Sequence, residues 1–152
     1  MTATAVAPTA PALNLEQAYQ HALQLTLQLA VSHHQAGRMA EAEQLYRGVL
    51  RVQPEQPQAS HNLGLLLLQA QQPAAALPHL ETALAAKPES ERYWLSYLDA
   101  LVQDGQTELA RERLAFACGH GLAGTEVEAL AAMLNTAAPA FAPAVVELQL
   151  GA

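Results

Sequence analysis

The chain has 152 residues, of which 51% are hydrophobic and 14% charged, with seven Lys and Arg against fourteen Asp and Glu and a net charge of −7. This length suits one ordinary domain, and the apolar fraction is too high for a wholly disordered chain. An acidic chain with a single lysine, Lys87, lacks the cationic surface that nucleic acid or anionic lipid requires, so we expect neither nucleic acid nor membrane as a partner.

Ala, Leu and Gln dominate the sequence, whereas the β-branched and aromatic residues that favour strands are sparse, so we predict an all-α fold. Gly and Pro residues divide the chain at regular places, and apolar residues recur between them at helical spacing. Asn14 can cap the first helix, with Gln17 positioned to complete a capping box. The pattern predicts helices over residues 15–36, 39–52, 57–70, 73–86, 90–103, 107–119 and 125–135.

Two features depart from this regular pattern. Pro78 lies inside the helix predicted over 73–86, where we expect a local distortion because proline has no amide N–H. Residues 1–12 and 136–152 carry Ala, Pro and Thr without helical periodicity, so we expect a disordered N-terminal tail and a C-terminal linker or tail. The folded domain is then expected over residues 13–135.

The predicted helices repeat with a period of 34 residues. A shift of this length places proline on proline, and it aligns small residues and large apolar residues each with their own kind. Small residues are expected where two helices approach closely, and large ones where a gap between helices is filled. The aligned columns are Pro54 with Pro88, Gly37 with Gln71 and Gly105, Ala42 with Ala76 and Ala110, Leu29 with Leu63 and Tyr97, and Tyr46 with Leu80 and Leu114.

This period and these residue types resemble the tetratricopeptide repeat, whose pattern is W-x2-L-G-x2-Y, then A-x3-F, then P. Trp94 takes the family's tryptophan position in the third repeat. The resemblance implies an α-solenoid of three helical hairpins, with repeats over about 23–56, 57–90 and 91–124 and a capping helix over 125–135. The alternative is an irregular helical bundle whose Ala and Leu richness imitates a period.

The sequence contains no catalytic motif, so we predict that this chain is not an enzyme and needs no cofactor. Six histidines suggest a metal site, chiefly at His33, His34 and His61. Adjacent helical residues point about 100° apart, so His33 and His34 cannot share an ion by themselves, and no third ligand is in view. We therefore predict no metal site. The lone Cys118 can form no internal disulfide, and we expect it to be a small buried thiol facing the capping helix.

In tetratricopeptide repeat proteins the first helix of each hairpin lines a concave groove, and the resemblance implies the same here. The residues carried to that groove are mostly neutral amides and aliphatics, which suit an extended peptide because an amide side chain donates to and accepts from a backbone peptide unit. A clamp on the acidic tail of heat-shock chaperones would need several Lys and Arg, and only Arg92 is present. The predicted partner-binding residues are Gln28, Val31, His34, Gln35, His61, Asn62, Leu65, Gln69, Arg92, Ser96 and Asp99.

Other features of the sequence bear on how such a module is used. Segments 35–54 and 93–106 resemble the repeat regions that precede bacterial glycosyltransferase, sulfotransferase and methyltransferase domains, which implies a substrate-recruiting or scaffolding part of a larger bacterial protein. The alternative is self-association as a homodimer, because an uncapped solenoid end exposes apolar area. With one cysteine and no secretory signal over residues 1–11, we expect a cytoplasmic location. The apolar stripe that favours self-association consists of Leu15, Ala18, Ala22, Leu25 and Leu29.

Overall fold

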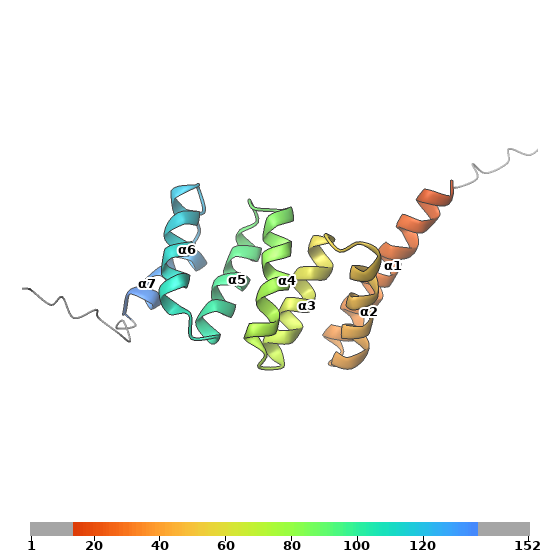
Figure 1. Ribbon diagram of the computed structural model, residues 1–152, viewed down its shortest axis with the longest axis horizontal. Coiled ribbons are helices and arrows are strands. Elements are labelled where there is room, and N and C mark those ends of the chain that lie inside the picture. The colour runs from red at the N-terminus through yellow and green to blue at the C-terminus, as the bar shows by residue number, and fades with distance from the viewer. Residues whose placement is uncertain (1–13, 137–152) are drawn as a thin grey trace, which may run out of the picture.

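The computed structural model describes residues 14–136, and every regular element in that range is an α-helix (Figure 1). The all-α prediction is confirmed, and each helix begins and ends within one residue of its predicted bounds. The tail predicted over residues 1–12 and the linker predicted over 136–152 lie outside the described residues, except for Thr136. The helices are α1 (Leu15–Gln35), α2 (Met39–Val52), α3 (Pro57–Gln69), α4 (Pro73–Ala86), α5 (Glu91–Gln103), α6 (Thr107–Gly119) and α7 (Thr125–Thr136).

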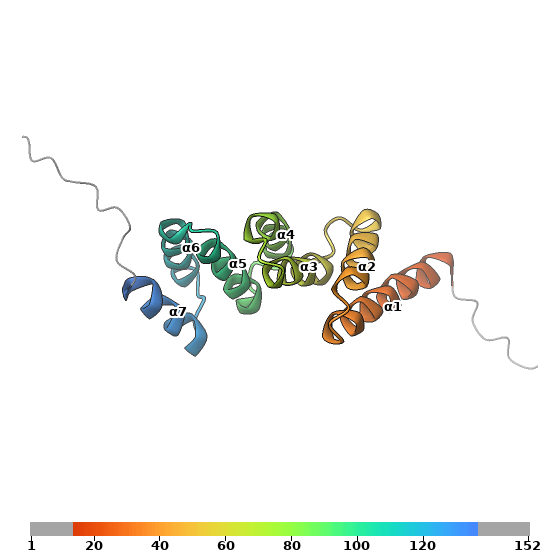
Figure 2. The same cartoon turned by 90° about the horizontal axis from the view of Figure 1, so that it is seen from below.

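The helices form one elongated row in chain order, each packed against the next (Figure 1). Figure 2 shows two layers, with α1, α3, α5 and α7 on one side and α2, α4 and α6 on the other. Within the first layer, α3 also contacts both α1 and α5. The resulting unit is a two-helix hairpin stacked three times, with α7 against α6 at the end of the row. None of the helices in residues 14–136 is long and apolar enough to cross a bilayer.

The turn inside each hairpin has the same backbone conformation. Gly37, Gln71 and Gly105 occupy equivalent places, and their φ angles are +75°, +58° and +78°. Glycine enters this left-handed region at no steric cost, whereas a residue with a Cβ is strained there. The chain reverses direction at these three points, so α1, α3 and α5 each run into their partner helix through an equivalent tight turn.

The closest approaches between helices occur at the small residues of the repeat. Ala42, Ala76 and Ala110 are each the fourth residue of the second helix of a hairpin and are each 0% exposed, so they occupy equivalent places. A Cβ added to Gly64 would lie 2.6 Å from Cγ and Cδ2 of Leu80, so α3 approaches α4 as closely as a glycine allows. The repeat predicted from the sequence is therefore present in the packing.

The N-terminal end of the row is less well covered than its interior. Leu29 is 50% exposed, whereas its equivalents Leu63 and Tyr97 are 0% and 6% exposed. In the second and third hairpins, α3 and α5 each pack against the preceding hairpin, and the described residues contain no hairpin before α1. Of the 21 residues of α1, only Leu27 and Ala30 are buried. The first helix thus presents an apolar side to its surroundings.

Two expectations about single residues differ from the structure. Cys118 is exposed, because α6 buries Ala110, Leu114 and Ala117, and the next residue along a helix is rotated about 100° away from that face. The prediction of a buried thiol was therefore wrong. The α4 helix is continuous through Pro78, its sixth residue, and the local distortion expected there stays a prediction.

Candidate interaction groove

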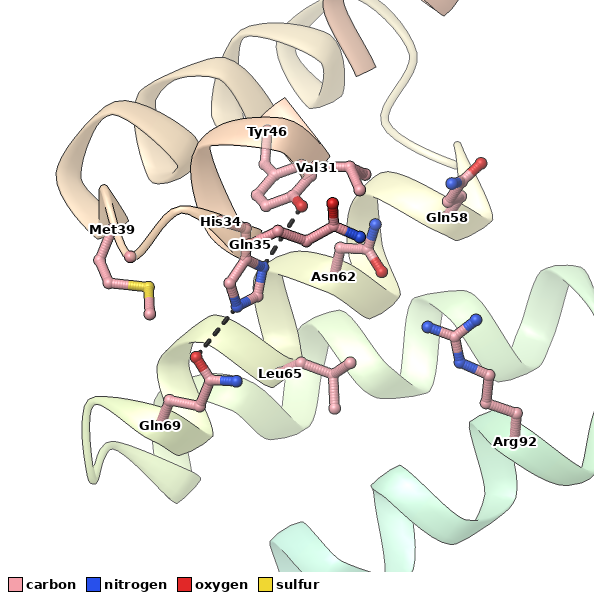
Figure 3. Close-up of a pocket in the computed structure, with 11 residues that line it drawn as sticks. Val31, His34, Gln35, Met39, Tyr46, Gln58, Asn62, Leu65, Gln69 and Arg92 are labelled. Carbon is pink, nitrogen blue, oxygen red and sulfur yellow. Dashed lines mark hydrogen bonds between the residues drawn. The ribbon is translucent and has the colours of Figure 1, made fainter. Parts of the chain in front are cut away.

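A cavity of about 590 Å³ opens on the layer formed by α1, α3 and α5, next to the turn between α1 and α2 (Figure 3). We call this cavity the groove. Its lining is rich in neutral amide side chains and aliphatic groups. The lining residues are Val31, His34 and Gln35 of α1, Gly37 of the turn, Met39 and Tyr46 of α2, Gln58, Asn62, Leu65 and Gln69 of α3, and Arg92 of α5.

His34 is held by hydrogen bonds at both ring nitrogens. Its Nε2 lies 3.0 Å from Oε1 of Gln69, and its Nδ1 lies 3.4 Å from the hydroxyl of Tyr46 (Figure 3). Because an amide oxygen only accepts, the imidazole donates through Nε2 to Gln69. The two rings meet edge-on, with centroids 6.0 Å apart. These contacts join α1, α2 and α3 at one point of the groove wall and fix the orientation of the imidazole.

Tyr46 and Asn62 form the buried part of this wall, with exposed fractions of 0% and 8%. Burial raises the pKa of the Tyr46 hydroxyl, and a hydrogen bond with Asn62 partly offsets that rise. The hydroxyl therefore stays protonated at neutral pH. Asn62 lines the cavity beside this phenol.

His61 lies beneath the groove surface, with an exposed fraction of 1%. Its Nε2 lies 2.8 Å from Oγ of Ser96, which itself donates to the carbonyl oxygen of Arg92 at 3.0 Å. The ring also stacks on Tyr93, with centroids 4.5 Å apart. Burial lowers the pKa of His61 to about 4, and the positive charge of Arg92 contributes to the same effect. His61 and Ser96 thus connect α3 to α5 below the groove, which corrects the expectation that His61 lines it.

The structure brings most of the predicted site residues together, but not all of them. The predicted residues in the lining are Val31, His34, Gln35, Asn62, Leu65, Gln69 and Arg92. Gln28 and Asp99 are exposed but lie outside the lining, and Asp99 accepts a hydrogen bond from Gln103 at 2.7 Å. Met39 and Tyr46 reach the groove from α2 and were not among the predicted residues. A signal for Tyr46 existed, since it is the polar member of a column otherwise filled by leucine.

Arg92 is the formally charged side chain of the groove, and the remaining polar groups of the lining are amides, a phenol and an imidazole. Amides provide a donor and an acceptor on one side chain, which matches the donor and acceptor of a peptide unit. The described residues contain no group of three His, Cys, Asp or Glu side chains close enough together to hold a metal ion. The chemistry that this lining offers is hydrogen bonding and shallow apolar contact.

Hairpins stacked at a fixed 34-residue period, with equivalent alanines at each contact, define the chain as an α-solenoid. Models of the tetratricopeptide repeat match it at residues 21–89 and 67–115. The chain belongs to the tetratricopeptide repeat family. A comparison with curated proteins found no matching sequence.

Solved structures of other proteins share this fold. MamA of Desulfovibrio magneticus RS-1 has a TM-score of 0.67 and 25% identity, and the match covers 74% of this chain and 64% of that chain. The chain therefore spans less than two thirds of the MamA structure. The first repeat domain of Spaghetti (RPAP3), bound to an HSP90 peptide, has a TM-score of 0.67, 13% identity and coverage of 74% and 90%. The Yersinia enterocolitica chaperone SycD, in complex with a YopD peptide, has a TM-score of 0.64, 16% identity and coverage of 76% and 88%.

Proposed function

We propose that this chain is a protein-interaction module that binds an extended peptide segment of a partner in the groove. The observation that carries the proposal is the lining itself, in which amides and aliphatic side chains surround a cavity of about 590 Å³. The structures of RPAP3 and SycD support it, because both similar folds were solved with a peptide bound. The module carries no catalysis of its own in this proposal, and its location is the cytoplasm.

Asn62 and Leu65 are the groups that we propose contribute most to binding. Both lie on α3, which is central in the row, and one helical turn places them on the same face. Asn62 would pair with a backbone peptide unit, and Leu65 would contact an apolar side chain next to it. Gln35 and Gln69 extend the amide surface toward the α1–α2 turn, while Arg92 offers a cation at the other side of the cavity (Figure 3).

A random peptide library panned against the full chain tests this proposal. We expect enriched peptides to bind the purified chain in fluorescence anisotropy, and Asn62→Ala with Leu65→Ala to weaken that binding by about tenfold or more. Gln44→Ala, on the exposed side of α2, is the matched control and should leave affinity unchanged. Circular dichroism confirms that the double variant is folded. Failure to enrich any peptide, or equal binding by the double variant, would overturn the proposal.

We further propose that the module is a substrate-recruiting or scaffolding part of a larger bacterial protein. The support is the resemblance of segments 35–54 and 93–106 to repeat regions that precede bacterial transferase domains. The test is to read the parent gene beyond the codon for Ala152. Several hundred further codons that encode an enzyme domain would support this role, and a stop codon at that point would contradict it.

Self-association is a second candidate function, because one observation favours it. Leu15, Leu25 and Leu29 of α1 are 88%, 50% and 50% exposed, on the side where a further hairpin would otherwise pack. Burial of this stripe against a second copy would remove it from water. Sedimentation over a range of concentrations should then show a dimer that Leu25→Glu with Leu29→Glu converts to monomer. A wild-type chain that is monomeric at every concentration would exclude this function.

A further inference from the structure

A second hollow, of about 440 Å³, lies away from the groove at the place where α5 begins and α6 ends. Its lining contains three aromatic rings, those of Trp94, Phe116 and His120, and two carboxylates, those of Glu89 and Glu91. We call it the aromatic hollow. It lies in the third hairpin, shares no lining residue with the groove, and takes no part in the peptide binding proposed above.

The rings of this hollow are fixed by contacts within the chain. The indole Nε1 of Trp94 donates to the carbonyl oxygen of Pro88 at 2.8 Å, which sets the orientation of the indole. Phe116 and His120 lie with their ring centroids 4.1 Å apart, and Nδ1 of His120 donates to the carbonyl oxygen of Phe116 at 2.8 Å. Phe116 is nevertheless 54% exposed. An aromatic ring held in place and left open to the surroundings is available to a ligand.

The repeat provides an internal comparison for this hollow. Shifting its residues by 34 positions leads to Pro54, Glu55, Thr82 and Ala86, which line a hollow of the same volume, about 440 Å³, in the second hairpin. There the counterpart of Phe116 is a threonine and the counterpart of His120 is an alanine. The stack therefore forms this hollow without the two rings. The rings of Phe116 and His120 therefore change the chemistry of the lining, whereas the helix packing that forms the hollow is the same.

The charge of the lining indicates what the hollow accepts. Its residues include two carboxylates and no lysine or arginine. The carboxylate of Glu91 lies against the backbone of Gly124, where an added Cβ would be 2.5 Å from its Oε1. The face of an aromatic ring is the negative end of its quadrupole and attracts cations. Rings and carboxylates on one surface, without a competing cation, favour a positively charged ligand.

We propose that the aromatic hollow binds the quaternary ammonium group of an organic cation. A primary ammonium is strongly hydrated and would need several acceptors to replace its water, whereas a trimethylammonium group donates no hydrogen bonds and contacts ring faces through its methyl groups. A hollow of about 440 Å³ accommodates such a group together with part of the molecule that carries it. Trp94 and Phe116 contribute ring faces, and Glu89 and Glu91 contribute negative charge.

Trp94 is the single tryptophan of the chain, so its fluorescence reports directly on this hollow. The full chain is titrated with choline chloride, with sodium chloride at matched ionic strength as the salt control. The neutral isostere 3,3-dimethylbutan-1-ol, which replaces the quaternary nitrogen by carbon, separates charge from shape. We expect a saturable change with choline and at least fivefold weaker binding of the alcohol, as cation–π attraction requires. No saturation, or equal binding of both probes, would overturn the proposal.

Variants taken from the second hairpin complete the test. Phe116→Thr with His120→Ala gives these two positions the residues found at their counterparts Thr82 and Ala86, and should weaken choline binding at least fivefold. Glu89→Gln should weaken it by a smaller factor, whereas the equivalent change Glu55→Gln should have no effect. Circular dichroism checks that the double variant keeps its helix content. Unchanged choline affinity in a folded double variant would contradict the proposal.

Discussion

Gly64 of α3 lies directly beneath the side chain of Leu80 of α4, and an added Cβ would be 2.6 Å from two carbon atoms of that leucine. Leu80 is 0% exposed and cannot move aside. Gly64→Ala should therefore lower the free energy of unfolding by about 1–3 kcal/mol, although alanine is the better helix former. Urea unfolding followed by circular dichroism measures this change.

The matched control for this substitution is Gly48→Ala in α2. A Cβ at Gly48 would lie 3.8 Å from its nearest neighbour, a guanidinium nitrogen of Arg51, which is an ordinary contact. Here only helix propensity acts, and the same substitution should raise stability by about 0.5–1 kcal/mol. If Gly64→Ala were also stabilising, the close packing of α3 on α4 would be wrong.

Gln71 is the non-glycine member of the turn column, with φ of +58° where Gly37 and Gly105 have +75° and +78°. A residue with a side chain costs about 1–2 kcal/mol in this region, and replacing it by glycine relieves that strain. Part of the relief is offset because glycine makes the unfolded chain more flexible. Gln71→Gly should raise the free energy of unfolding by about 0.5–1 kcal/mol, and the melting temperature should rise with it. Gly105→Ala, the reverse change in the next hairpin, should lower stability by a similar amount. A destabilised Gln71→Gly variant would show that the glutamine side chain makes a compensating contact.

The sequence predicted the helices and their stacking because both depend on local, repeated signals. Prolines, turn glycines and the alanine column recur at one spacing, and each acts within a few residues of its own position. The assignment of the first helix of each hairpin to the groove came from the resemblance to the tetratricopeptide repeat family. Val31, Asn62 and Leu65, which were among the residues predicted from that resemblance, line the groove, and their part in binding stays a prediction.

What the sequence could not predict was the depth of each side chain within that layer. His61 and Asn62 are neighbours on α3, yet His61 is 1% exposed beneath Ser96 of the next hairpin, while Asn62 lines the cavity. The difference in burial depends on how α5 packs against α3. This packing is a contact between two hairpins, and no local sequence pattern specifies it. Met39 and Tyr46 were missed for a related reason, because they reach the groove from the second helix of the first hairpin.

Substitution of serine by alanine should have opposite effects on stability at Ser60 and at Ser96. Ser60 is 1% exposed, and its hydroxyl has no hydrogen-bond partner within the described residues. Removing an unsatisfied buried hydroxyl should stabilise the protein, so we expect Ser60→Ala to raise the free energy of unfolding by about 1 kcal/mol. Ser96→Ala removes the acceptor of the buried His61 and should lower it by about 1–3 kcal/mol. Urea unfolding of the two variants measures both changes. If the free energy of unfolding changed in the same direction in both, this explanation would be wrong.

His61 should make the stability of the protein depend on pH. Its pKa is about 4 in the folded protein, whereas an unfolded chain has the ordinary value of 6.5. Between these values the unfolded state binds more protons than the folded state, so stability is complete above about pH 6.5 and falls as the pH drops toward 4. The full difference in pKa corresponds to a loss of about 3 kcal/mol from this one residue.

Carboxylates also titrate near pH 4, so the contribution of His61 must be measured as a difference between variants. His61→Phe keeps a ring stacked on Tyr93, and Ser96 retains its bond to the carbonyl of Arg92, so this variant should fold. Between pH 7 and pH 4.5, wild type should lose about 2 kcal/mol more stability than His61→Phe. The pKa of His79 is also lowered by burial and by Arg47, but this effect is common to both proteins and cancels. His21→Gln, at an exposed position, should behave as wild type, whereas parallel pH profiles for wild type and His61→Phe would show that His61 is not held neutral by burial.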